Sequence, residues 1–427
     1  MKQLRRKFRD EGIAWRLMIT FAVAASAVNV SADGFRLPDQ DAFATARGEA
    51  FAATADNASA IYYNPAGISQ LKGGNFRGGI YGIYLPVSYK SPTGRSFDNE
   101  KDLQAVPQLF FTYTPNESRL SYGLGIYAPF GLGFRWPQDT GFRTLAIESQ
   151  LTYLSINPVV AWRILPNLSV GGGLTANYAK ADVRSGLVWP DQPNDQFRFK
   201  GDGWDVGYNF GALWRVHEKV SIGVSFRSST KINLEGHTEY YNNIALPPVP
   251  AFPNQRVSAE TDVHFPLNVV CGISYRPTPK WNLEFDADYT DWSTMDTVTI
   301  KQATGFASLL PKDIPATLAW QPAWYYKFGG TRYFDNGWSL SAGYIYSENA
   351  MPDAHYSPLI ADSARHWLSI GTGFKRRRFD FDIAYQFGIG DGVRTVSGSA
   401  PSATGQTADG RYTYISHAVL ATVGFHF

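Results

Sequence analysis

Several short stretches of the chain alternate apolar and polar residues with a period of two. In WNLEFDADY (281–289), aromatic and aliphatic side chains alternate with Asn282, Glu284, Asp286 and Asp288. The stretches FDFDIAYQF (379–387) and WDVGYNFGALW (204–214) show the same division. Successive side chains of a strand point to opposite faces of a sheet, so each stretch predicts a strand with one apolar and one polar face.

The distribution of aromatic residues indicates where the apolar faces lie. A soluble sandwich hides its apolar faces in a core. Here these faces carry large aromatics near the strand ends, and the opposite faces hold glycine, serine and acids, as expected for a membrane barrel with a polar lumen. Aromatics make up 15% of the 427 residues. We therefore predict an all-β fold, a transmembrane antiparallel β-barrel, with a soluble all-β protein as the alternative.

Short and long connections alternate along the predicted strands. Short turns are expected at 114–118, 165–167, 217–219, 276–280, 334–337 and 375–378. Longer polar or Pro/Gly-rich links are expected near 90–105, 131–148, 184–199, 234–265, 294–315, 348–364 and 389–410. Outer-membrane barrels alternate short periplasmic turns with long extracellular loops. These connections predict about fourteen strands, with the C-terminus on the periplasmic side.

The pattern of residues at the N-terminus indicates an export signal. A basic stretch (2–16) precedes the apolar run LMITFAVAASAVNV (17–30) and the small residues Ser31 and Ala32. This order predicts a signal peptide over 1–32; a twin-arginine signal is the alternative to an ordinary leader. Removing it leaves 33 basic and 35 acidic residues, so no nucleic-acid partner is expected.

The segment 33–75 has a different pattern from the strands that follow it. The Ala-rich stretch DAFATARGEAFAATADNAS precedes a compact IYYNPAG turn, and neither alternates. Side chains alone do not fill a barrel of about fourteen strands. We predict that 33–75 forms a hatch inside the lumen and that 76–427 forms the barrel.

The last strand ends in an aromatic residue. Phe427 follows Val419, Ala421, Val423 and Phe425 on one face of an alternating stretch. We interpret Phe427 as an outer-membrane assembly signal for the barrel assembly machinery. The basic run 375–378 falls at a short turn, where basic residues meet lipid headgroups, and a nucleic-acid patch is the less favoured reading.

Motifs along the whole mature chain resemble those of one family. The stretches GFRLPDQ, ADNASAIYYNPAGISQL, GIYAPFGLGFRW, GVSFRSS and RHWLSIGTGF look like the FadL/TodX family of outer-membrane transporters for long-chain fatty acids and hydrocarbons. The resemblance implies a fourteen-stranded barrel with an N-terminal hatch and passive passage of hydrophobic substrates. It also implies that Asn64, Pro65, Ala66 and Gly67 belong to the hatch and rearrange to open a path.

The same resemblance implies a lateral opening in the barrel wall. An inward kink of the third strand would lie in the region of Gly125, Pro129, Phe130, Gly131 and Gly133. Proline cannot donate to a strand ladder, and glycine-rich stretches bend strands, which agrees with this placement. An ordinary barrel corner with glycine and proline is the alternative.

Hydrophobic substrates suggest further candidate residues. Burial of a methylene group contributes about 0.8 kcal/mol, so an apolar surface in the long loops would capture such a molecule. The candidates are Leu187, Trp189, Leu246 and Phe252. If the substrate carries a carboxylate, the inward-facing cations Arg227 and Lys327 are candidate partners, and pairing with acids of the wall is the alternative.

Other functions are less well supported by the sequence. The seven histidines form no nucleophile or metal pattern, and the single cysteine, Cys271, excludes an internal disulfide. We expect no enzyme and no cofactor. The expected partners are a hydrophobic small molecule, outer-membrane lipid and lipopolysaccharide, and the expected state is a monomer in a Gram-negative outer membrane. A general diffusion porin or a surface adhesin is the alternative function.

Overall fold

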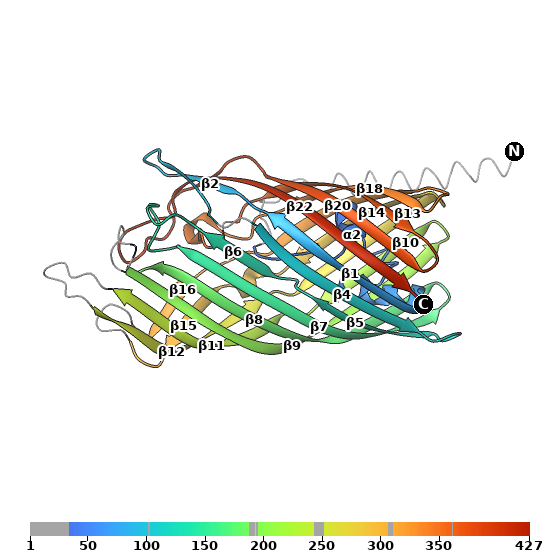
Figure 1. Ribbon diagram of the computed structural model, residues 1–427, viewed down its shortest axis with the longest axis horizontal. Helices are drawn as coiled ribbons and strands as arrows, with labels where there is room; N and C mark the ends of the chain where they lie inside the picture. The colour runs from blue at the N-terminus through green and yellow to red at the C-terminus, as the bar shows by residue number, and fades with distance from the viewer. Residues whose placement is uncertain are drawn as a thin grey trace. The chain divides into compact units, whose positions relative to one another are not determined.

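Antiparallel strands form a closed barrel in the computed structural model of the chain (Figure 1). The structure describes residues 34–100, 103–187, 193, 195–242, 252–305, 311–360 and 362–427. Each wall strand pairs with its neighbours along the chain, and β1 (Gly73–Tyr84) pairs with β22 (Gly410–His426) to close the ring. The predicted fourteen-stranded antiparallel barrel is confirmed.

Several of the fourteen wall strands consist of two pieces. Between β1 and β22, the wall contains β4 (Leu103–Thr114), β5 (Leu120–Tyr127) with β6 (Gly131–Arg135), β7 (Glu148–Leu165), β8 (Leu168–Gly186), β9 (Asp195–His217), β10 (Val220–Arg227) with β11 (Thr230–Asn242), β12 (Phe252–Phe265) with β13 (Asn268–Thr278), β14 (Trp281–Thr290) with β15 (Thr297–Gln302), β16 (Asp313–Thr317) with β17 (Ala323–Tyr333), β18 (Trp338–Ser347), β19 (Arg365–Lys375) and β20 (Phe379–Gly390). The short strands β2 (Val87–Lys90) and β21 (Arg394–Val396) pair with the end of β22, and β3 (Ser96–Asp98) pairs with β2.

The alternation read from the sequence appears as a difference in exposure. On β9, Trp204, Val206 and Tyr208 are 59%, 66% and 53% exposed, whereas Asn209 is 3% exposed. Likewise Leu283 of β14 is exposed, and its neighbours Asn282 and Glu284 are buried. The outer surface is therefore a broad apolar band, which a lipid bilayer covers and water does not.

Some predicted loops are strand instead. The link expected at 234–265 contains the β11–β12 ladder, which runs from Thr230 opposite Phe265 to Asn242 opposite Phe252. β8 and β9 likewise extend into the link 184–199, and β6 lies within 131–148. The outer ends of these strands carry polar residues on their outward face, so the apolar half of the period-two signal ends before the hydrogen-bond ladder does.

The compact motifs near the N-terminus form short helices. They are α2 (Ala42–Ala46), α3 (Ala60–Tyr63) and the 3₁₀ helix η1 (Pro65–Gln70); two further turns, η2 (Trp292–Thr294) and η3 (Asp353–His355), lie between strands. Asp41 caps α2 by accepting bonds from the amides of Phe43 (3.0 Å) and Ala44 (3.2 Å). Asn64 caps η1 in the same way, with Pro65 at its first position. Among the described residues, no helix is long and apolar enough to cross a membrane.

A charge on the outward face tests the membrane setting of the strands. Ile370 of β19 is 54% exposed and points outward. We expect Ile370→Arg to lower the free energy of unfolding in lipid vesicles by about 2–4 kcal/mol, because the guanidinium must enter hydrocarbon. Denaturant titration in vesicles measures this change. Ile370→Ala is the control and should cost much less; equal losses would contradict the membrane setting.

Candidate site between the N-terminal segment and the barrel wall

Residues 34–72, here called the N-terminal segment, are almost entirely buried against wall strands. Phe51, Ile61 and Asn64 are all 0% exposed. Helix η1 contacts β7, β8 and β9, while α2 contacts β18, β19, β20 and β22. The segment therefore touches strands in widely separated parts of the ring, on their polar faces.

Wall glycines make room for the backbone of this segment. A Cβ added to Gly211 of β9 would lie 2.2 Å from Asn64 Oδ1, and one added to Gly223 of β10 would lie 2.0 Å from the carbonyl oxygen of Ala52. Both distances are far inside van der Waals contact. The glycines of these strands thus serve a close approach of two backbones.

Asn64 joins the N-terminal segment to the wall. Its Nδ2 donates to the carbonyl oxygens of Ala52 (2.7 Å) and of Ala212 in β9 (3.0 Å), and its Oδ1 accepts from the amide of Ala66 (3.2 Å). Pro65, Ala66 and Gly67 are buried beside it. Both polar atoms of the Asn64 side chain are therefore hydrogen-bonded, with two bonds inside the segment and one to a strand.

The acids of β14 receive the backbone of the N-terminal segment. Asp286 Oδ2 accepts from the amides of Phe51 and Ala52, each at 2.9 Å. Glu284 accepts from the amides of Ala53 (2.7 Å) and Thr54 (3.2 Å). These amides lie in a stretch with little helix of its own, so the wall supplies the acceptors that a longer helix would provide.

The next acid of β14, Asp288, holds two cations. Arg36 of the segment donates to both of its oxygens, at 3.0 and 2.7 Å, and Lys327 of β17 lies 2.5 Å from Oδ2. All three side chains are buried. Lys327 therefore points inward as predicted, and it is paired with an acid of the wall.

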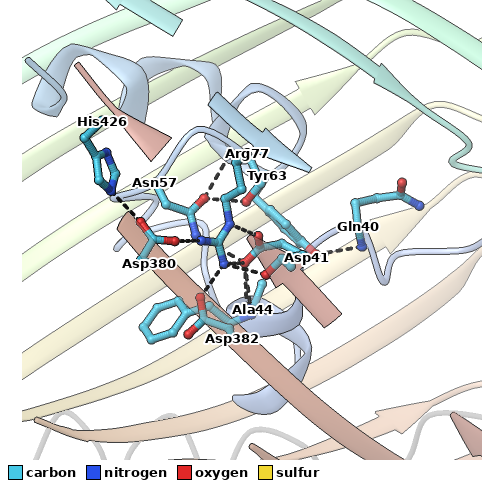
Figure 2. A network of polar contacts seen from close by, with 12 residues as sticks. Gln40, Asp41, Ala44, Asn57, Tyr63, Arg77, Asp380, Asp382 and His426 are labelled. Carbon is cyan, nitrogen blue, oxygen red and sulfur yellow. Dashed lines mark hydrogen bonds and ion pairs between the residues drawn. The ribbon is translucent and has the colours of Figure 1, made fainter. Parts of the chain in front are cut away.

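A second ionic cluster joins the segment to β1 and β20 (Figure 2). Arg77 of β1 bonds Asp41 of the segment, and it also bonds Asp380 and Asp382 (2.6 Å) of β20 and Thr422 of β22 (2.8 Å). Asp41 also accepts from Asn57 Nδ2 (3.1 Å). A single buried arginine thus bridges one carboxylate of the segment and two of the wall.

The third wall strand is interrupted where the kink was predicted. β5 ends at Tyr127 and β6 begins at Gly131, with Pro129 and Phe130 between them. Here the wall pairs with the N-terminal segment: the amide of Leu37 donates to the carbonyl of Pro129 (2.8 Å), and that of Gly131 donates to the carbonyl of Phe35 (3.0 Å). Pro129 and Gly131, two of the residues predicted for the kink, are therefore hydrogen-bonded to the segment.

The neighbouring strand β4 stops pairing with the third wall strand near this interruption. β4 pairs with β5 only from Leu109 to Tyr113, and β6 pairs with β7. Gln104 of β4 reaches β6 with its side chain, whose Nε2 donates to the carbonyl of Gly133 at 2.9 Å, and the amide of Glu100, before β4, donates to the carbonyl of Arg135 at 2.7 Å. Gly125 lies below the break, facing Ile61 of the segment.

A cavity adjoins this break. Its volume is about 80 Å³, and its lining combines the start of the N-terminal segment with the wall. Apolar groups on the lining include Phe134, Ile83 and Trp367, and polar groups include Arg36 and Arg365. Asp39 and Asp362 lie on the same lining, so its charges are of both signs. The cavity thus offers apolar contact together with polar groups, which suits a mainly apolar molecule with a polar end.

Arg227 lies between the segment and the third strand. Its Nη1 donates to the hydroxyl of Tyr127 (2.7 Å), and its Nη2 donates to the carbonyl of Tyr62 (3.1 Å). The guanidinium stacks on both rings, 4.6 Å from the Tyr62 centroid and 5.3 Å from that of Tyr127. Within the described part of the chain, no carboxylate forms an ion pair with Arg227, in contrast to Lys327.

Two buried acids of the segment share one hydroxyl. Thr45 Oγ1 donates to Glu49 Oε1 at 2.6 Å and lies 3.3 Å from Asp39 Oδ1. Burial raises the pKa of Glu49 well above its usual range, and the nearby Asp39 raises it further. Burial also raises the pKa of Asp39. The protonated form of Glu49 is thus favoured in the folded segment.

The predicted capture residues are only partly within the described structure. Leu187 packs against Tyr240 and Val257 at the outer end of the wall. Trp189 and Leu246 lie outside the described residues, and Phe252 begins β12 with a side chain that is also outside them. Their role in capture stays a prediction. No group of metal-ligating side chains occurs in the described ranges.

A match to a family model identifies the protein family of this chain. The model described as Outer membrane protein transport protein (OMPP1/FadL/TodX) matches residues 23–427. The chain belongs to this family. It is an outer-membrane protein of Gram-negative bacteria, as the sequence predicted.

Individual relatives agree with the family assignment. The chain is 24% identical over 421 residues to the long-chain fatty acid transport protein of Escherichia coli (strain K12), covering 87% of this chain and 91% of the relative. It is 26% identical over 382 residues to the 47 kDa outer membrane protein of Pasteurella multocida (strain Pm70), covering 84% and 87%.

Solved structures share the fold. A Pseudomonas aeruginosa FadL homologue superposes with a TM-score of 0.80 at 16% identity, covering 92% of this chain and 100% of the other. The toluene transporter TodX of Pseudomonas putida gives 0.73 at 14% identity, with coverages of 92% and 100%. These matches support a FadL-like barrel.

Sequence reasoning missed the residues that fasten the segment. Arg36, Asp41 and Arg77 were not singled out, and the acids of 281–289 were seen only as a polar face. Asp41 carried a usable signal, because an Asp before an Ala-rich stretch is a typical N-cap. The partners of Arg77 lie more than 300 residues away along the chain, at Asp380 and Asp382, so no local pattern announces them.

A methyl group at a wall glycine tests how tightly the segment is held. We expect Gly211→Ala to displace Asn64 and to increase hydrogen exchange at the amides around Ala52 and Ala66, measured by mass spectrometry. Gly82→Ala on β1 is the control, because its added Cβ would lie 3.8 Å from the nearest neighbouring atom, the carbonyl oxygen of Val419. Equal exchange in the two variants would contradict the close approach.

Proposed function

We propose that this protein carries long-chain fatty acids or aromatic hydrocarbons passively across the outer membrane, with the N-terminal segment as a movable hatch. Family membership supports transport. The observation that carries the proposal is that the break in the third strand, the start of the segment and the cavity adjoin one another. A molecule in the cavity is therefore next to both candidate routes, past the segment and through the wall.

The partly apolar lining favours transport over a general porin. An apolar cavity offers water few hydrogen bonds, whereas burial of each methylene of a hydrocarbon chain contributes about 0.8 kcal/mol of binding free energy. The E. coli relative is named as a long-chain fatty acid transport protein and the P. putida structure as a toluene transporter. Neither a porin nor an adhesin needs a wall break beside such a cavity.

The bonding of Arg77 supports a hatch that can detach without leaving a bare charge. If Asp41 moves away, Arg77 retains Asp380, Asp382 and Thr422. Asp41 in turn retains the α2 cap. Because loss of one partner of a buried charge is costly only when nothing replaces it, this contact suits repeated breaking.

The acids of β14 support a fixed side of the same hatch. Asp286 and Glu284 receive four backbone amides of the segment, at distances between 2.7 and 3.2 Å. Opening there would leave many groups without partners. We infer that the hatch swings from the β1–β20 side while the β14 side holds.

Asn64→Ala tests the hatch. Loss of the amide removes three hydrogen bonds at the segment, so we expect uptake of a labelled long-chain fatty acid and of toluene to change together in a host that lacks its own transporter. Deletion of 33–70 should change uptake further while the barrel still assembles. Asn116→Ala, in an exposed turn, is the control. Wild-type uptake of both compounds by both hatch variants would refute the hatch.

Arg227→Gln tests recognition of a carboxylate. A hydrogen bond to a charged group contributes about 1.5–3 kcal/mol, so we expect fatty-acid uptake at limiting concentration to fall about tenfold or more, with toluene uptake unchanged. Lys327→Gln, which leaves Asp288 paired with Arg36 alone, should affect both compounds alike. Normal fatty-acid uptake by the Arg227→Gln variant would exclude Arg227 as the carboxylate partner.

A further inference from the structure

The end of the barrel that bears the short turns is strongly basic. Exposed cations occur at Arg215 and Lys219, at Arg276 and Lys280, and throughout 375–378. Among the described residues of these turns, the exposed acids are Glu117, Glu218 and Asp335, with the half-buried Asp56 nearby. Yet the mature chain predicted from the sequence carries slightly more acids than bases, so the positive charge is concentrated at one end.

One arginine of this end is held among lipid-facing aromatics. Arg332 of β17 lies opposite Trp281 of β14 in the ladder. Its guanidinium lies 5.2 Å from the Trp281 ring and 5.4 Å from the Phe334 ring. Trp281 and Phe334 are 39% and 41% exposed on the outer surface. The charge is therefore fixed where the apolar band meets water.

Arg376 has the same setting on the neighbouring part of the wall. Its guanidinium lies 5.4 Å from the ring of Phe374, which packs against Trp338 and Phe381. Trp338 is exposed on the outer surface. In the described part of the chain, neither Arg376 nor Arg332 forms an ion pair with a carboxylate, whereas Lys280 in a nearby turn pairs with Asp335 at 2.6 Å.

We propose that Arg332 and Arg376 are binding sites for the phosphate of anionic phospholipids in the leaflet facing the short turns. A guanidinium offers a planar pair of donors that matches a phosphate, and stacking on an aromatic ring fixes its plane. Short turns of outer-membrane barrels face the periplasm, so this leaflet is the inner one. The surrounding turn cations raise the local concentration of anionic lipid.

The position of the two arginines favours lipid over a soluble acidic protein. Both lie at the edge of the apolar band and stack on rings of the lipid-facing surface, which headgroups reach and a soluble partner does not. The inference is independent of the hatch and of the transported substrate, since it uses only the outer surface of the wall.

The test compares lipid retention by four forms of the protein. Wild type, Arg332→Ser/Arg376→Ser, Arg332→Lys/Arg376→Lys and the control Lys180→Ser/Lys301→Ser are purified with equal amounts of phosphatidylglycerol and phosphatidylethanolamine, and retained lipid is counted by native mass spectrometry. The control lysines are exposed at the other end of the barrel. We expect a preference for phosphatidylglycerol in wild type that falls about fivefold or more in the serine variant and partly in the lysine variant.

The outcomes separate the possibilities. An unchanged preference in the control, with folding of every variant verified by heat-dependent gel migration, supports the sites. Equal loss in the control and in the arginine variant would show charge alone to be responsible and would overturn the proposal. The proposal would also be overturned if the serine variant kept its preference for phosphatidylglycerol, or if the wild type showed no such preference.

Discussion

A strand in hydrocarbon must have its backbone hydrogen bonds satisfied by other strands, and the rest of this structure depends on that requirement. Lipid offers no donors or acceptors, so a sheet with free edges is not stable in it. The pairing of β1 with β22, from Asn75 opposite His426 to Tyr84 opposite His417, removes both edges. Once the ring is closed, the outward faces must be apolar, and the polar residues of each strand are directed to the interior.

That interior explains the N-terminal segment. A ring of this width leaves space that side chains do not fill. The segment consists of short helices, in which few backbone amides find a hydrogen-bond acceptor. The wall supplies carboxylate acceptors at Glu284 and Asp286, and its glycines Gly211 and Gly223 leave room for the backbone of the segment. Some of the many glycines in the chain therefore lie where the backbone of the N-terminal segment packs directly against a wall strand.

The strands of the wall could be predicted from the sequence, but the contacts that hold the N-terminal segment against the wall could not. Stretches such as 281–289 and 379–387 revealed strand, face and membrane setting, because lipid imposes a strict period of two. The outer ends of β11 and β12 were taken for a loop, because their outward residues are polar there. The partners of Asn64, Arg77 and Arg36 depend on which strands are opposite one another across the ring, and a period-two pattern contains no such information. Lys327 was correctly directed inward by parity, but its pairing with Asp288 required the structure.

The bonds between residues 35–37 and the interrupted third strand have a consequence for how this wall is completed. Over this short span, the backbone of residues 35–37 takes the place that β4 would occupy in an unbroken ladder. Without these bonds, the carbonyl of Pro129 and the amide of Gly131 would have no partner at this level of the wall. Sealing of the interior and integrity of the wall are, at this one point, the same event.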